Sequence, residues 1–284
     1  MQQESKKESC GYLYIACGKK YIAEAEISAR SLKRFTQHPV CIVTDDAAYV
    51  NSLFDKVVYI NETSDFVSKI IGLPSTPYQR TIFLDTDTFV CSNIDNLFTC
   101  LDLFDMSLST DPYIHSYSFL HKYNPSFQLA YEKVIPQYNT GVIVYKTNDA
   151  VTKLFHDWLL LHRQMNVKAN MPSFREAFIA NAATVRIIPL PNEYNFTGIK
   201  SFAIAFSEIK ILHERLAEKK GTLTAYMQSF DKMDKFTRRL NRYQYKRIII
   251  PYFGAIPYTY SPFMIKARVR KFFGVKKHRK SESN

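Results

Sequence analysis

Short apolar runs that alternate with helical segments constrain the fold of this 284-residue chain more than any other feature. The runs Tyr12–Ala16, Val40–Thr44 and Lys56–Ile60 are rich in strand-forming residues, and their side chains are apolar on both faces. Strands of this kind belong to a mostly parallel sheet that helices cover on both sides. The sequence therefore predicts an α/β fold.

The spacing of apolar residues predicts the remaining elements in the same way. The further strands expected are Thr81–Asp85, Thr88–Val90, Gly141–Tyr145, Val185–Ile188 and Ile209–Leu212. The helices expected are Tyr21–Phe35, a helix from the cap Thr147–Asp149 to about Gln164, and Phe174–Ala182. One domain is expected over residues 10–233, and a separate tail over residues 234–284.

Two carboxylates stand at the end of an apolar strand, in Thr81–Asp85 followed by Thr86 and Asp87. Residues two apart in an extended chain point the same way, so both carboxylates can face one site. They repel each other unless a cation lies between them, and Mg²⁺ or Mn²⁺ prefers such oxygen ligands. Asp45 also ends a predicted strand, at the sheet edge where ligands bind. A solvated turn or a helix cap is the alternative interpretation of this Asp-x-Asp.

These segments, in their order, resemble the GT-A nucleotide-diphospho-sugar transferases, and most closely glycosyltransferase family eight. The resemblance spans about residues 11 to 215, and it implies a GT-A fold with a mostly parallel central sheet. The basic C-terminal tail beyond it is expected to be helical from its own mixture of apolar residues and cations. It also implies transfer of a hexosyl group from a nucleotide-diphosphate donor, such as a UDP-sugar, to a glycan or glycolipid. The matching segments are Tyr12–Cys17 with Tyr21, Pro39–Asp45, Gln79–Val90, Asn93–Phe98, Tyr138–Tyr145 and Ile211–His213.

The resemblance also implies roles for individual residues. Mn²⁺ or Mg²⁺ would be bound by Asp85, Asp87 and His213. The base and ribose pocket would be lined by Ala16, Cys17, Tyr21 and Asp45, with Arg80 near the ribose or the diphosphate. The donor sugar would lie beside Asn139, Thr140 and Gly141. The candidates for catalytic roles are Asp87, Asn139 and Arg175.

Some of these residues have a structural alternative. A lone histidine after a strand, such as His213, is more often structural when the residues alone are considered. Asn170–Pro172 stands where the family often has Asp-Gln, and the Gly-x-Lys-Pro-Trp of the family is missing after His213. Ser173 and Glu176 fit the cap and capping box of the next helix, and Arg175 between them faces either a phosphate or solvent.

The basic side chains are concentrated in the tail. From Asp234 onward the chain has 14 of its 38 Lys and Arg residues but 2 of its 26 Asp and Glu residues, so the tail accounts for the whole net charge of +12. Interleaved Tyr and Phe suit the headgroup region of an anionic membrane, and a solvated tail is the alternative. Nucleic acid is not expected as a partner.

The ends and the cysteines indicate the compartment. Residues 1–9 are polar and lack the apolar core of a signal peptide, so we expect a cytoplasmic protein that is peripheral at the inner face of a membrane. The five cysteines have no metal-ligand spacing and are expected to be reduced, because a pair such as Cys91 and Cys100 would need an oxidising compartment.

Two other functions stay open from the sequence. A nucleotidyltransferase would make the activated sugar, but Cys17–Lys20 is a poor version of its Gly-rich basic loop. In a non-enzymatic binding protein the donor site would no longer be functional, and only the basic tail would still bind a partner. We expect a retaining transferase. For a retaining enzyme of this kind the sequence offers no convincing protein nucleophile, so front-face attack assisted by the leaving phosphate is the expected mechanism.

Overall fold

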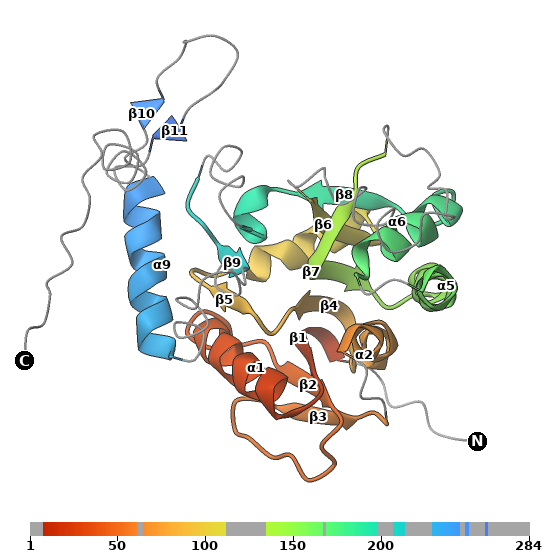
Figure 1. Cartoon of the computed structure of the whole chain (residues 1–284), viewed down its shortest axis with the longest axis horizontal. Coiled ribbons are helices and arrows are strands. Elements are labelled where there is room, and N and C mark those ends of the chain that lie inside the picture. Colours follow the sequence, from red (N-terminus) through yellow and green to blue (C-terminus); the bar gives the residue numbers. More distant parts are fainter. Residues whose placement is uncertain are drawn as a thin grey trace, which may run out of the picture.

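The computed structural model describes residues 8–61, 65–111, 135–166, 169–197, 207–213, 229–244, 248–249 and 259–260. Its centre is a seven-stranded sheet with the order β3-β2-β1-β4-β7-β6-β8 (Figure 1). All strands run in one direction except β7, which is antiparallel to both of its neighbours. This confirms an α/β fold with a mostly parallel sheet. The strands are β1 (Glu8–Ala16), β2 (Val40–Thr44), β3 (Lys56–Tyr59), β4 (Tyr78–Leu84), β6 (Met106–Thr110), β7 (Tyr138–Lys146) and β8 (Ile187–Leu190).

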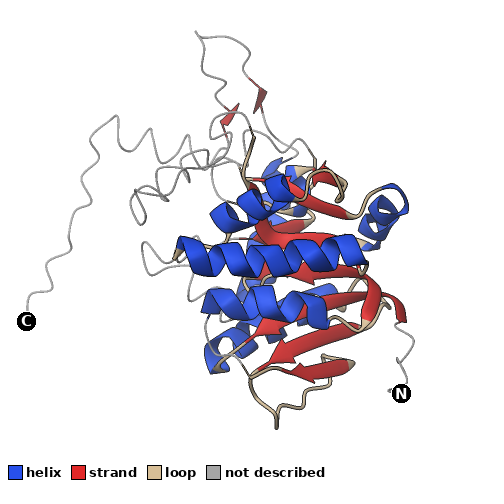
Figure 2. Cartoon of the chain, turned by 90° about the vertical axis from the view of Figure 1, so that its right-hand side faces the viewer, coloured by secondary structure: helices blue, strands red, loops and turns tan. Residues whose placement is uncertain are grey.

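Helices cover both faces of this sheet, as the two-sided apolar strands require. One face packs on α1 (Lys19–Leu32), η2 (Asp95–Thr99) and α3 (Cys100–Leu103). The opposite face packs on α2 (Asp65–Gly72), η1 (Leu73–Ser75), α5 (Asp149–Met165) and α6 (Met171–Ala180), and Figure 2 looks onto this side.

Alternate residues of each strand enter the two cores, because successive side chains point to opposite faces. In β1, Tyr12 and Tyr14 face the α1 side, whereas Leu13 faces the side of Trp158 in α5. All of these residues are fully buried.

A small second sheet joins two distant parts of the chain. It pairs β5 (Thr88–Val90) with β9 (Ile211–His213) in antiparallel fashion, with Thr88 opposite His213. Phe196, which follows η3 (Asn192–Tyr194), forms an isolated bridge to Leu212 of β9. The histidine of the predicted metal site ends β9 of this ribbon, and the second carboxylate, Asp87, immediately precedes β5.

The helix α9 (Phe230–Gln244) lies beside α1 and the small sheet (Figure 1). Met233 of α9 is buried against Phe89 of β5, and Asp234 forms an ion pair with Arg34. The predicted boundary at residue 233 therefore falls inside a helix that packs on the body, and the division into a domain and a tail stays a prediction. Beyond α9, β10 (Ile248–Ile249) pairs with β11 (Thr259–Tyr260), and the rest of the tail lies outside the described residues.

Two details of the sequence prediction are corrected. The helix expected from Phe174 begins at Met171, because Pro172 fits the first turn of a helix, and Asn170 is its N-cap residue. Ser173 is therefore not the cap: its hydroxyl donates to the Asn170 carbonyl and bonds to Trp158 and His162. The capping box with Glu176 was wrong for the same reason.

The five cysteines are all free thiols, as predicted. None of the helices in the described part of the chain combines the length and the apolar character that crossing a bilayer requires.

Candidate active site

Most of the predicted site residues meet at the carboxyl ends of β1 and β4. Chain connections leave these two neighbouring strands in opposite directions along the sheet, β1 toward β2 and β4 toward β7. A crevice opens at such a switch point, and ligands of α/β sheets bind there. The structure has a cavity of about 300 Å³ at this place. It is lined by Ile15, Cys17, Tyr21, Ser68, Lys69, Asp85, Thr86, Asp87, Asn139, Thr140, Gly141, Ala169, Asn170, Met171 and His213.

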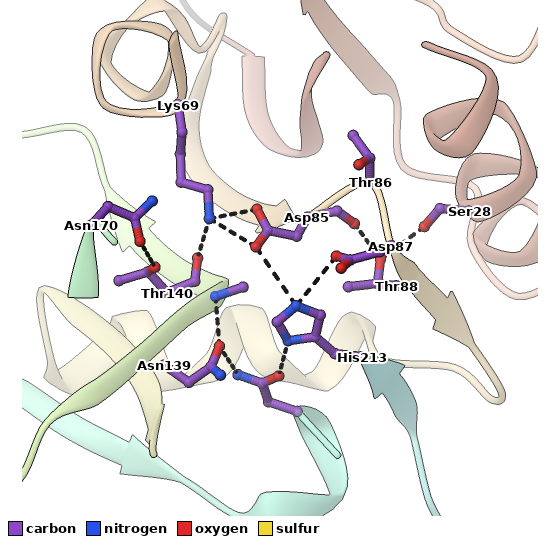
Figure 3. Close-up of polar contacts among 12 residues, drawn as sticks. Ser28, Lys69, Asp85, Thr86, Asp87, Thr88, Asn139, Thr140, Asn170 and His213 are labelled. Carbon is purple, nitrogen blue, oxygen red and sulfur yellow. Dashed lines mark hydrogen bonds and ion pairs between the residues drawn. The ribbon is translucent and has the colours of Figure 1, made fainter. Parts of the chain in front are cut away.

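Three potential metal ligands converge on one side of this cavity. Nε2 of His213 lies 3.3 Å from Oδ1 of Asp87 and 3.7 Å from Oδ2 of Asp85 (Figure 3). One ligand atom from each of the three residues lies within 4.8 Å of the others. The structure therefore brings together the three residues for which the family resemblance implies metal binding.

The turn that carries the two carboxylates is fastened to α1. The Thr86 hydroxyl donates to Glu24 at 3.0 Å, and the Thr88 hydroxyl donates to the Asp85 carbonyl at 2.7 Å. Ser28 of α1 contacts the Thr88 hydroxyl at 2.8 Å. These contacts, of which the one between Ser28 and Thr88 is buried, hold the chain as it leaves β4 and so orient both carboxylates.

His213 reaches the carboxylates because β7 leaves room for its ring. A Cβ atom at Gly141 would lie 1.9 Å from Cε1 of His213, so no larger residue fits at this position with the ring in place. On the other side, Nδ1 of His213 lies 2.7 Å from Oδ1 of Asn195. Asn195 is also 3.1 Å from Oδ1 of Asn139, which accepts the Gly141 N–H at 2.9 Å.

Burial and the neighbouring carboxylates have opposite effects on the pKa of His213. Burial alone would lower its pKa, but the nearby carboxylates of Asp87 and Asp85 outweigh burial and raise the pKa above its ordinary value. A positive charge is thus favoured at this position in the absence of an ion.

Lys69 of α2 also enters the cavity, and the sequence analysis missed it. Its ammonium lies 2.6 Å from Oδ1 and 2.8 Å from Oδ2 of Asp85, and it donates to the Thr140 carbonyl at 3.3 Å. The apolar residues Val67, Ile70 and Ile71 around it have helical spacing, and this pattern could have revealed α2.

The residues expected around the donor lie in different places. Cys17 and Tyr21 line the cavity, as do Asn139, Thr140 and Gly141, whereas Ala16 is buried at the end of β1. Thr140 donates to the side chain of Asn170 at 3.0 Å, which ties β7 to the start of α6. Asp45 follows β2 and accepts a 2.8 Å hydrogen bond from the backbone N–H of Gly18. Gly18 directly precedes α1, and its φ of 84° is a backbone conformation that favours glycine.

Two predicted arginines lie outside the cavity. Arg80 is five residues before Asp85, about 16 Å away along an extended strand, and its guanidinium pairs with Asp102 at 2.6 Å. Arg175 is fully buried in α6, where it donates to the carbonyl of Ile135 and pairs with Glu176. This position is neither the phosphate contact nor the solvated position that the sequence left open. Neither placement supports the role that the resemblance implies.

Comparison with known proteins confirms the resemblance at the level of the fold. No protein-family model matches the sequence, and no curated protein sequence gives a significant match. Among solved structures, a galactosyltransferase, LgtC, in complex with donor and acceptor sugar analogs superposes with a TM-score of 0.52 at 11% identity, covering 80% of this chain and 95% of LgtC.

Two further glycosyltransferases give similar results. For GlyE of Streptococcus pneumoniae TIGR4 the TM-score is 0.54 at 12% identity, with 83% of this chain and 64% of GlyE covered. For the bifunctional glycosyltransferase WbbM it is 0.51 at 12% identity, and 87% of this chain spans about half (52%) of WbbM. The chain thus has the GT-A-like fold of these glycosyltransferases over most of its length.

Proposed function

We propose that this protein is a metal-dependent glycosyltransferase that moves a hexosyl group from a nucleotide-diphosphate donor, such as a UDP-sugar, to a glycan or glycolipid. One observation carries the proposal. The ligand atoms of Asp85, Asp87 and His213 converge at the switch point of the sheet, beside a cavity of about 300 Å³. A cavity of this size is at the lower end of those that bind small molecules.

The three side chains fit a divalent ion such as Mn²⁺ or Mg²⁺. Ligands of one such ion lie roughly 3 to 4 Å apart, because each is about 2.1 Å from it. The Nε2 of His213 is 3.3 and 3.7 Å from the nearest carboxylate oxygens, within this range. When bound, the ion would neutralise charge that develops on the leaving nucleoside diphosphate.

The protein's own residues would bind and orient the two substrates. Cys17 and Tyr21, at the end of β1 and in α1, are assigned to the nucleoside side of the cavity, with Asp45 at its outer edge. Asn139 and Gly141 of β7 are assigned to the donor sugar. The observation that supports this division is the strand order, in which β4, the strand that precedes Asp85 and Asp87, lies between β1 and β7.

The carboxylates also bear on the stereochemical outcome. Among the described residues that line the cavity, only Asp85 and Asp87 are acidic, and both belong to the proposed metal site. Neither is then available as a nucleophile for a double displacement. Neither is available as the general base of an inverting reaction for the same reason. We therefore propose retention by front-face attack: the acceptor oxygen bonds to the anomeric carbon as the bond to the diphosphate breaks, and the acceptor proton passes to the leaving phosphate oxygen.

Calorimetric titration of the full-length protein tests the proposal. We expect UDP or another nucleoside diphosphate to bind in the presence of Mn²⁺ and not in its absence. Hydrolysis of a bound nucleotide-sugar should release the nucleoside diphosphate without pyrophosphate. Pyrophosphate would indicate a nucleotidyltransferase instead, and the absence of any nucleotide binding would contradict both enzymes.

We also propose that the basic C-terminal segment binds an anionic membrane from the cytoplasmic side. Lys232, Lys235 and Arg238 are exposed on α9, and the segment from Asp234 onward holds 14 basic residues. Each cation near such a surface contributes about 1 kcal/mol of binding free energy. Co-sedimentation with vesicles that contain phosphatidylserine should therefore fall when residues 245–284 are removed. Equal sedimentation of both forms would contradict the proposal.

A further inference from the structure

The side chain of Asn195 lies between a proposed metal ligand and the strand β7. We infer that Asn195 is a positioning residue that holds His213 in the Nδ1–H tautomer, so that its Nε2 lone pair faces Asp85 and Asp87. This inference rests on the proposed function, because the Nδ1–H tautomer matters only if Nε2 binds a metal. It concerns a residue that the sequence analysis did not single out.

The direction of the hydrogen bonds follows from one fixed donor. The backbone N–H of Gly141 can only donate, and it lies 2.9 Å from the side-chain oxygen of Asn139. That oxygen also lies 3.1 Å from Asn195, which must therefore present its NH₂ group to it. The other end of the Asn195 amide is then its oxygen, and this oxygen lies 2.7 Å from Nδ1 of His213.

An amide oxygen only accepts hydrogen bonds, so Nδ1 of His213 must carry the proton. The second proton of the charged ring is on Nε2, which faces carboxylate oxygens 3.3 and 3.7 Å away that compete for it (Figure 3). When that proton leaves, or when an ion replaces it, the lone pair of Nε2 faces the two carboxylates. Turning the Asn195 amide around would place its oxygen against the oxygen of Asn139. The polarity of one peptide group in β7 thus determines which histidine nitrogen can bind a metal.

Burial makes this arrangement selective. Asn195 is 1% exposed, so water has little access with which to replace its hydrogen bonds. The backbone that follows Asn195 is held as well, because the Phe196 N–H donates to the Ile211 carbonyl and the His213 N–H donates to the Phe196 carbonyl. Residues that bond to the second nitrogen of a ligating histidine commonly fix its tautomer and orientation in this way.

Nitrogen-15 NMR of the metal-free protein at alkaline pH, where the ring is neutral, reads the tautomer directly. His213 is one of seven histidines, and its signals are those lost in His213→Gln. We expect Nδ1–H in the native protein. In Asn195→Leu we expect a shift toward Nε2–H, the form that free histidine favours, and in Asn195→Asp, which keeps an acceptor, we expect Nδ1–H. Nε2–H in the native protein would overturn the inference.

Titration with Mn²⁺ provides the second readout. We expect Asn195→Leu to weaken binding about 10- to 100-fold, the usual effect of losing such a partner, and Asn195→Asp to bind at least as tightly as the native protein. The matched control is Asn96→Ala, which removes a 2.9 Å hydrogen bond to Tyr194, the residue before Asn195. This variant leaves the hydrogen bonds between Asn139, Asn195 and His213 in place. Its affinity for Mn²⁺ should be unchanged.

The two measurements separate the possible failures. If the native protein binds Mn²⁺ and Asn195→Leu binds it equally well, the role of Asn195 is wrong and the proposed function stands. If the native protein binds no Mn²⁺, the proposed metal-dependent function is contradicted. The tautomer measurement still decides the direction of the hydrogen bonds from Gly141 through Asn139 and Asn195 to His213.

Discussion

The ammonium of Lys69 lies within 2.6 and 2.8 Å of the two carboxylate oxygens of Asp85, so a side chain of α2 contacts both oxygens of a proposed metal ligand (Figure 3). The Lys69 side chain is 14% exposed, which limits the screening of this ion pair by solvent. The pocket thus has a cation of its own that balances one of its two carboxylates.

Replacing Lys69 is expected to strengthen metal binding in the absence of nucleotide. Lys69→Met removes the positive charge that competes for Asp85, and we expect Mn²⁺ affinity to rise about tenfold, the effect of roughly 1.4 kcal/mol of charge interaction. Titration calorimetry measures the change. Lys33→Met, which breaks the ion pair with Asp55 at the C-terminal end of α1, should leave the affinity unchanged. A weaker or equal affinity in Lys69→Met would show that this lysine does not oppose the ion.

Asp87→Ala should abolish the thermal stabilisation that Mn²⁺ and a nucleotide-sugar give to the native protein. A ligand that binds only the folded state raises the melting temperature by mass action, and the variant lacks one of the proposed ligands. The fold itself should survive, because the change also removes the repulsion between Asp85 and Asp87. Asp102→Ala, which removes an exposed carboxylate on α3, should keep the full increment. An undiminished increment in Asp87→Ala would exclude this site.

Gly141→Ala should displace His213, because the added Cβ would lie 1.9 Å from Cε1 and 2.4 Å from Nδ1 of the ring. We expect Mn²⁺ affinity to fall at least tenfold, as for the loss of a ligand's support. Gly18→Ala is a useful control. No atom lies within 4 Å of its new Cβ, so its positive φ should cost about 1 to 2 kcal/mol of stability without weakening metal binding. Similar affinities in both variants would contradict the steric argument.

Asp105 should contribute to stability at neutral pH and lose that contribution in acid. Burial alone would raise its pKa, but hydrogen bonds from the side chain and backbone of Arg186 outweigh burial and lower the pKa below its ordinary value. The folded state then binds this proton less readily than the unfolded state. The contribution is therefore complete above the unfolded pKa of about 3.9 and disappears as the pH falls through the lower folded pKa.

Urea unfolding at several pH values tests this linkage. At pH 7 we expect Asp105→Asn to be less stable than the native protein by about 1 to 2 kcal/mol, the value of a hydrogen bond to a charged group. Below the folded pKa the two proteins should converge. A constant difference at all pH values would mean that ionisation of Asp105 does not matter.

The sheet was predictable because its strands carry their information locally. Val40–Thr44 is apolar at almost every position, and the structure has β2 at these residues. Asp85 and Asp87 were placed correctly at a strand end for the same reason. Met106–Thr110 was missed as a strand because Ser107 and Ser109 interrupt the continuous apolar run by which the other buried strands were recognised. Both serines are nevertheless buried in the sheet, where they donate to carbonyls of Ile188 and Pro191.

The partners within the site could not be predicted in this way, because they depend on contacts between distant segments. Asn195 meets His213 only after Phe196 has paired with β9, and the sequence holds no periodic signal for this contact. Arg175, in contrast, was predicted as a site residue but lies in the protein interior. Its charge suggested a phosphate or solvent, but Glu176 and the Ile135 carbonyl provide its partners in the interior.

The pairing of β5 with β9 has a consequence for the order in which the protein matures. During synthesis the two carboxylates emerge from the ribosome long before His213, so a nascent chain can present Asp85 and Asp87 without their imidazole. A complete ion site can form only after the ribbon has closed. Tight binding of the ion at the proposed site would therefore report that the body of the protein has finished folding.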